Sequence, residues 1–165
     1  MSRAFVKEGD GALDPWPDLP LSAHPNSVTR RGLADLQDRL RQAQGRLADL
    51  KARAERLDKL PEAAAERDIR YLEARLRSAI LVDPAQHDLS CVAFGLCVQV
   101  CDAQGRTHTY EITGEDEADP ALGRISAHAP LARALLGGEL GDSVTWTKPS
   151  GTTDLTISAI LCPKD

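Results

Sequence analysis

The sequence has no run of apolar residues that approaches the length needed to cross a membrane. Its beginning, MSRAFVKEGDGALDPWP, is polar, acidic and proline-bearing, so it contains no apolar core of the kind that a secretion signal requires. Charged residues are 27% and hydrophobic residues 42% of the 165 residues, as in ordinary soluble proteins. We therefore expect a cytoplasmic protein that does not contact a membrane.

The chain also lacks the short motifs of common enzyme classes. It has no nucleophile triad signature, no P-loop and no dinucleotide fingerprint. Its four cysteines form no C-x-x-C pair, so neither a zinc ribbon nor a redox motif is indicated. A metal site of Cys97 and Cys101 with His87 or His108 is an open alternative, but free thiols are favoured. We predict no enzyme activity of its own and no stably bound cofactor or metal.

Charge is unevenly spread along the chain, whose net charge is −5. Residues 29–83 hold 13 basic and 10 acidic side chains, a net of +3, whereas residues 84–165 hold 5 basic and 11 acidic ones, a net of −6. An acidic globular half argues against direct, non-specific binding to duplex DNA, which requires many Lys and Arg side chains at phosphates. The split predicts two parts with different electrostatic roles.

Residues 1–28 are predicted to form a Pro-rich leader that is extended or disordered. Proline removes backbone donors and biases its neighbours toward extended geometry. Trp16 is the candidate anchor of this leader on a surface, and the alternative is a leader without a role.

Residues 29–83 are predicted to form an antiparallel coiled-coil hairpin. Thr29 is the expected N-cap of the first helix, and Pro61 suits the first turn of the second. The apolar seam of the first helix repeats with heptad spacing and consists of Leu33, Leu36, Leu40, Ala43, Leu47, Leu50, Ala54 and Leu57. The seam of the second consists of Ala65, Ile69, Leu72, Leu76 and Ala79. A parallel homodimer of the first helix would leave the second seam without a partner, so we favour the intramolecular pair and a monomer.

Residues 84–165 are predicted to form a small antiparallel sheet with one helix, which makes the whole chain α+β. Period-2 patterns and turn residues indicate strands at 92–100, 107–113, 124–127, 142–149 and 154–161. Pro130 is placed to open the helix, and Gly137 and Gly138 to close it. The expected core consists of Leu131, Leu135, Leu136, Val144, Trp146, Leu155, Ile157 and Ile160.

This order of parts, over residues 28–162, resembles the Gre transcript-cleavage-factor family (GreA/GreB) of bacterial transcription elongation factors. The stretches that carry the resemblance are VTRRGLADLQDRL, LEARLRSAILVDP, VAFGLCVQV, YEITGEDEAD and RISAHAPLARALLGGELGDSVTW. The resemblance implies an FKBP-like C-terminal domain and bacterial RNA polymerase as partner, with nucleic acid contacted only indirectly through the polymerase.

In that family the coiled coil enters the polymerase secondary channel, and acids at its tip help to hold a catalytic Mg²⁺ transiently. The resemblance places Asp58 and Glu62 at this tip. The chain lacks the family tip motif G-D-x-x-E-N-A-E-Y, and a second helix of about 20 residues spans roughly 30 Å, shorter than the arms of full cleavage factors. We interpret the two acids as ordinary helix-end charges.

Two further surfaces follow from the resemblance. The turn before the C-terminal helix, His128, Ala129, Pro130 and Leu131, is the expected polymerase-docking turn, although the acid and serine usual before its proline are replaced. The basic side chains expected to face the channel are Arg46, Arg53, Arg56, Arg67 and Arg70. Pairing with acids on a solvated helix face is the competing interpretation of these arginines.

We therefore expect a polymerase-binding elongation regulator that acts through the secondary channel with weak or no stimulation of transcript cleavage. The alternatives are a true cleavage factor that uses the tip acids, and a regulator of the short-armed Rnk type, which regulates nucleoside diphosphate kinase.

Overall fold

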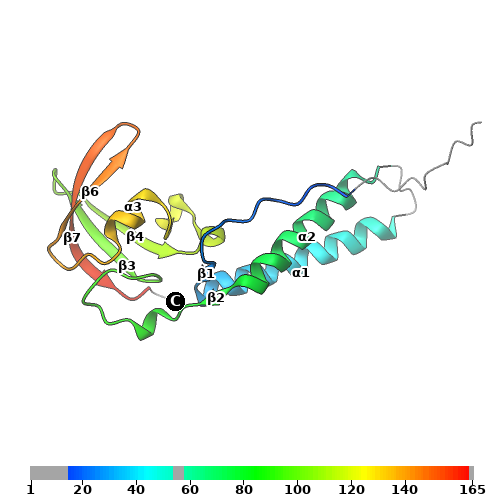
Figure 1. Ribbon diagram of the computed structural model, residues 1–165, viewed down its shortest axis with the longest axis horizontal. Coiled ribbons are helices and arrows are strands. Elements are labelled where there is room, and N and C mark those ends of the chain that lie inside the picture. The colour runs from blue at the N-terminus through cyan, green and yellow to red at the C-terminus, as the bar shows by residue number, and fades with distance from the viewer. Residues whose placement is uncertain (1–14, 54–57, 164–165) are drawn as a thin grey trace, which may run out of the picture.

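The computed structural model describes residues 15–53 and 58–163. A two-helix arm projects from one side of a curled sheet domain, so that the molecule is elongated (Figure 1). No helix in the described part of the chain is both long and apolar enough to cross a bilayer. The predicted α+β organisation, a helical hairpin followed by a small sheet domain with one helix, is confirmed.

The arm consists of α1 (Arg30–Ala52) and α2 (Leu60–Ser78), which run antiparallel against each other. As predicted, Thr29 is the N-cap of α1, because its side chain accepts a hydrogen bond from the backbone N–H of Gly32 at 2.9 Å. Helix α2 begins one residue before Pro61, where the missing N–H of proline costs no helical hydrogen bond.

The heptad seams form the contact between the two helices. Leu36 and Leu72 are buried together with Val28, and Leu33, Leu40, Ala43 and Leu76 pack against them. Leu50 and Ala65 are also buried nearer the tip. The predicted seam residues Ala54 and Leu57 lie outside the described residues.

Two short strands form the base of the arm. β1 (Ser27–Val28) pairs in parallel with β2 (Ile80–Leu81), so the chain that enters α1 lies beside the chain that leaves α2. The end of the predicted leader is therefore part of a small sheet. The predicted domain boundaries stay predictions.

The C-terminal sheet has five strands in the order β5-β4-β3-β7-β6. Their bounds are β3 (Cys97–Asp102), β4 (Thr107–Thr113), β5 (Arg124–Ser126), β6 (Ser143–Lys148) and β7 (Gly151–Leu161). Helix α3 (Pro130–Leu135) packs against this sheet. One prediction is corrected: β5 pairs with β4 in parallel, so the sheet is mixed rather than wholly antiparallel.

The loop between β4 and β5 explains the parallel pairing. Two 3₁₀ turns, η2 (Glu115–Glu117) and η3 (Pro120–Leu122), carry the chain back before β5 begins. Gly123 then bends the chain at φ +72°, and a Cβ there would lie 2.8 Å from the carbonyl oxygen of Thr109. A short return through 3₁₀ turns has no period that sequence patterns detect.

Another boundary also differs from its prediction. The strand expected at 92–100 begins only at Cys97, because the chain turns at Gly95 with φ +83°. The residues that precede β3 still belong to the core, since Val92 and Leu96 are buried.

The core of the sheet domain lies between the sheet and α3. Of the predicted core residues, Leu131, Leu135, Leu155, Ile157 and Ile160 are buried, and Val144 and Trp146 pack against them half-buried. Leu136 was expected in the core but is 36% exposed, because α3 ends at Leu135 and the chain turns away toward Gly137. The prediction missed Val92, Leu96, Val98, Val100 and Ile112.

Candidate functional site

The tip of the arm carries the two predicted acids in different environments. Asp58 is exposed, and its Oδ1 accepts a hydrogen bond from the backbone N–H of Leu60 at 2.9 Å. This contact satisfies one of the free N–H groups at the start of α2. Glu62 is only 8% exposed. Of the two carboxylates, that of Asp58 therefore faces solvent. One of its oxygens is already hydrogen-bonded to the backbone at the start of α2.

Metal-binding side chains do not gather in the described part of the chain. No group of three or more His, Cys, Asp or Glu residues there is placed to hold an ion. The cysteines of the open metal alternative, Cys97 and Cys101, are half-buried free thiols in β3. Burial, and then the nearby charge of Glu111, raises the pKa of Cys97 and keeps its thiol protonated.

The five arginines predicted to face the channel divide into three groups. Arg46, on α1, and Arg53, the residue just after α1, are both exposed. Arg56 lies outside the described residues. Arg67 and Arg70 on α2 contact residues that precede β1, the extended segment 15–26, which we call the N-terminal strap (Figure 1).

The strap lies along α2 through Trp16 and Asp18. Arg70 donates from Nη2 to the carbonyl oxygen of Trp16 at 2.8 Å and from Nε to Oδ1 of Asp18 at 2.6 Å. The guanidinium carbon of Arg67 lies 5.2 Å from the centre of the Trp16 ring, within cation–π range. Trp16, the predicted anchor of the leader, thus contacts both arginines of α2.

A groove of about 400 Å³ opens between the helices beside the strap. Leu19 of the strap lies on its wall, and the seam residues Ala43 and Leu72 contribute apolar surface. Arg39 and Arg46 also line the groove. This part of the arm therefore combines apolar surface with positive charge.

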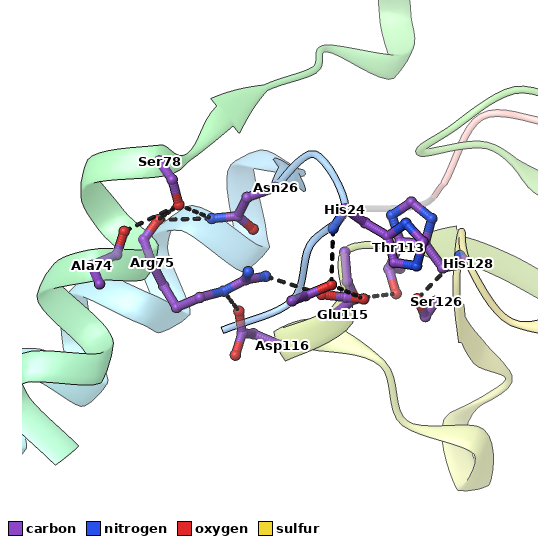
Figure 2. A network of polar contacts seen from close by, with 12 residues as sticks. His24, Asn26, Ala74, Arg75, Ser78, Thr113, Glu115, Asp116, Ser126 and His128 are labelled. Atoms are coloured by element: carbon purple, nitrogen blue, oxygen red, sulfur yellow. Dashed lines mark hydrogen bonds and ion pairs between the residues drawn. The ribbon is translucent and has the colours of Figure 1, made fainter. Parts of the chain in front are cut away.

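At the base of the arm, Arg75 of α2 joins the arm to the sheet domain. It is 3% exposed, and its Nε donates to Oδ2 of Asp116 at 2.5 Å, while its Nη2 lies 3.6 Å from Oε2 of Glu115 (Figure 2). Tyr71 donates its hydroxyl to Oδ1 of Asp116 at 2.8 Å. Burial, and then the hydrogen bond to Asp116, raises the pKa of Tyr71. The neutral hydroxyl therefore stays a donor to this carboxylate.

A second carboxylate of the same loop binds the start of α1. Glu117 accepts hydrogen bonds from Thr29 Oγ1 at 2.7 Å and from Arg31 Nε at 2.8 Å. Arg31 also donates to Glu111 of β4 at 2.6 Å. Partial burial lowers the pKa of Arg31, but its hydrogen bonds to Glu111 and Glu117 outweigh this effect and raise it. Sequence reasoning identified the acidic loop but missed that its carboxylates fix the arm to the domain.

The predicted docking turn lies at the same junction. His128 stacks on His24 of the strap, with ring centres 4.0 Å apart and planes inclined by 13° (Figure 2). Ala129 is half-buried as the N-cap of α3, and Pro130 is exposed. Leu131 is 4% exposed and belongs to the domain core, so it offers no surface for docking.

Comparison with known proteins identifies relatives of this chain. A family model, "Transcription elongation factor, GreA/GreB, C-term", matches residues 86–161. Transcription elongation factor GreA of Nautilia profundicola is 40% identical over 121 residues, which are 72% of this chain and 74% of that protein. GreA of Pseudomonas putida is 38% identical over 125 residues, 72% of this chain and 78% of that protein. Both matches are longer than residues 86–161 and so are not confined to the sheet domain.

A solved structure, the prokaryotic transcription elongation factor GreA/GreB from Nitrosomonas europaea, is also similar to this chain. It is 21% identical, covers 82% of this chain and 98% of that chain, and gives a TM-score of 0.42.

Proposed function

Because this chain belongs to the GreA/GreB family of transcription elongation factors, we propose that it binds RNA polymerase and regulates elongation with its helical arm in the polymerase secondary channel. The observation that carries this proposal is the match over about three quarters of two GreA proteins, in a chain whose arm is a paired two-helix hairpin. Nucleic acid is then contacted only through the polymerase.

We further propose that stimulation of RNA cleavage is weak or absent. Two-metal cleavage needs carboxylate oxygens that reach the ion in a defined geometry. Glu62 is buried, and one oxygen of Asp58 caps the N–H of Leu60, which supports this proposal. The site for Mg²⁺ in this mechanism belongs to the polymerase, so the chain itself acts at most as a helper of that enzyme.

A cleavage assay with purified polymerase tests the second proposal. Backtracked elongation complexes carrying labelled RNA are incubated with Mg²⁺, with and without the protein. We expect a cleavage rate within about twofold of polymerase alone, and no further change in Asp58→Ala or in Asp58→Ala combined with Glu62→Ala. A strong stimulation that the double substitution abolishes would instead identify a true cleavage factor.

Binding to the polymerase is measured separately, because a regulator need not cleave. Labelled protein is titrated with core polymerase at fixed salt. Charge-reversed arm variants, Arg46→Glu and Arg53→Glu, are expected to bind more weakly, mainly through a slower association rate. The control for charge reversal is Lys148→Glu on β6, which lies outside the arm and outside the predicted docking turn. If the wild-type protein does not bind core polymerase, a role away from the polymerase, as in the Rnk type, is the favoured interpretation.

A further inference from the structure

The N-terminal strap is ordered against the arm by contacts at both of its ends. Near its start, Trp16 and Asp18 contact Arg67 and Arg70, and Leu19 lies on the wall of the groove between the helices. The strap has no helix or strand of its own, and its four prolines at 15, 17, 20 and 25 favour an extended path. An extended segment with an aromatic ring and an acid is well suited to a basic, partly apolar surface.

The far end of the strap is held at the junction of arm and sheet domain. Ser22 donates to Oε1 of Glu115 at 2.9 Å, and His24 stacks on His128. Asn26 donates from Nδ2 to the carbonyl oxygen of Arg75 at 2.7 Å and to Ser78 Oγ at 3.1 Å (Figure 2). The strap therefore contacts His128 of the predicted docking turn as well as the side of α2.

These contacts coincide with surfaces that the proposed function uses. Of the channel-facing arginines within residues 15–53 and 58–163, the strap contacts Arg67 and Arg70 and leaves Arg46 and Arg53 exposed. An acidic partner surface that approaches this side of α2 meets Asp18 and Trp16 before it meets the guanidinium groups. The strap thus supplies, from the chain itself, the kind of acidic group that a partner would bring.

We propose that the N-terminal strap is an autoinhibitory segment, an internal acidic and aromatic ligand of α2 that an acidic surface of the polymerase must displace. This inference rests on the proposed function. The side chain of Asp18 is 73% exposed and that of Arg70 is 37% exposed, so their ion pair is easily broken. The strap nevertheless competes well, because its attachment to α1 makes its effective concentration high.

Strap docking is tested first in the free protein, without polymerase. The chain has two tryptophans, so Trp146→Phe leaves Trp16 as the only one. In this background we expect Asp18→Asn to increase the quenching of Trp16 fluorescence by acrylamide. Asp154→Asn, an exposed position on β7, removes the same charge outside the strap and should leave quenching unchanged. Equal quenching in both variants would show that Asp18 does not hold the strap and would overturn the inference.

Polymerase binding is then measured with the full chain at fixed salt. The variant Trp16→Ala with Asp18→Asn keeps every arm arginine, and we expect it to bind core polymerase about three- to tenfold more tightly, because apparent affinity scales with the fraction of protein whose strap is open. Asp154→Asn, an exposed charge-matched control on β7, should bind like the wild type.

The outcomes separate the two proposals. If the released-strap variant binds as the wild type does, or more weakly, the autoinhibitory role is wrong and polymerase binding stands. If none of the proteins binds polymerase, including the variant with a released strap, both proposals are wrong. Tighter binding by the released-strap variant alone supports the inference.

Discussion

Among single residues, Glu117 contributes one buried carboxylate that binds the start of α1 to the sheet domain. Its side chain is 2% exposed and accepts from Thr29 and Arg31. We expect Glu117→Ala to lower the free energy of unfolding by about 2–3 kcal/mol, less than for a fully buried ion pair, because Arg31 is one-third exposed and can regain water. Urea unfolding followed by circular dichroism measures this loss.

Two comparisons accompany that measurement. Glu117→Gln keeps the shape and one acceptor oxygen, so its loss should be smaller. Glu73→Gln, at an exposed position of α2, should change stability by less than about 0.5 kcal/mol. A Glu117→Ala variant as stable as the Glu73 variant would contradict the role assigned to this carboxylate.

Asp102, in the turn between β3 and β4, makes a pH-dependent contribution. The backbone N–H of Arg106 and its side chain donate to it, as does the backbone N–H of Gln104, and these bonds lower its pKa to about 2 despite burial. Since the unfolded value is about 3.9, this stabilisation is fully present above pH 4 and is lost as pH falls toward 2.

We therefore expect Asp102→Asn to be less stable than the wild type at pH 7, with a difference that narrows between pH 4 and pH 2. Thermal unfolding across this range measures it. Asp154→Asn controls for the loss of one negative charge on the same sheet. A difference independent of pH would mean that the carboxylate contributes through shape rather than charge.

Among the elements, α1 contains two glycines with opposite roles. A Cβ at Gly45 meets no atom within 4 Å, whereas a Cβ at Gly32 would lie 2.6 Å from Oε2 of Glu117. We expect Gly45→Ala to stabilise the protein by about 0.5–1 kcal/mol through helix propensity. Gly32→Ala should destabilise it, because the Glu117 network must move. Thermal unfolding of this matched pair checks both signs, and stabilisation by both changes would contradict the tight approach at Gly32.

The elements also show which features sequence reasoning can reach. Local signals identified the Thr29 cap, the heptad seams and β4, because each depends on neighbours within a few residues. In contrast, the parallel pairing of β5 with β4 and the hydrogen bond between Glu117 and the N-cap of α1 join residues that are far apart in the chain. Acidic loop residues resemble solvated charges until their partners are known, so the ion pairs of the junction and the partners of the strap could not be predicted, although Trp16 was identified as an anchor.

For the whole molecule, the proposed function requires that the arm keep its orientation on the sheet domain. Arg75 is the buried link, since it pairs with Asp116 and Glu115 across the junction. We expect Arg75→Ala to leave both half-buried acids without this partner and to loosen the arm. Small-angle X-ray scattering should then show a broader distribution of interatomic distances than in the wild type.

The matched control is Arg77→Ala, an exposed position two residues along the same helix, which should scatter like the wild type. Under the proposed function, a loosened arm also predicts weaker polymerase binding, because only the fraction of molecules with a competent orientation can enter the channel. Unchanged scattering in Arg75→Ala would mean that Glu117 and Arg31 suffice to hold the arm, since they join α1 to the domain independently of Arg75.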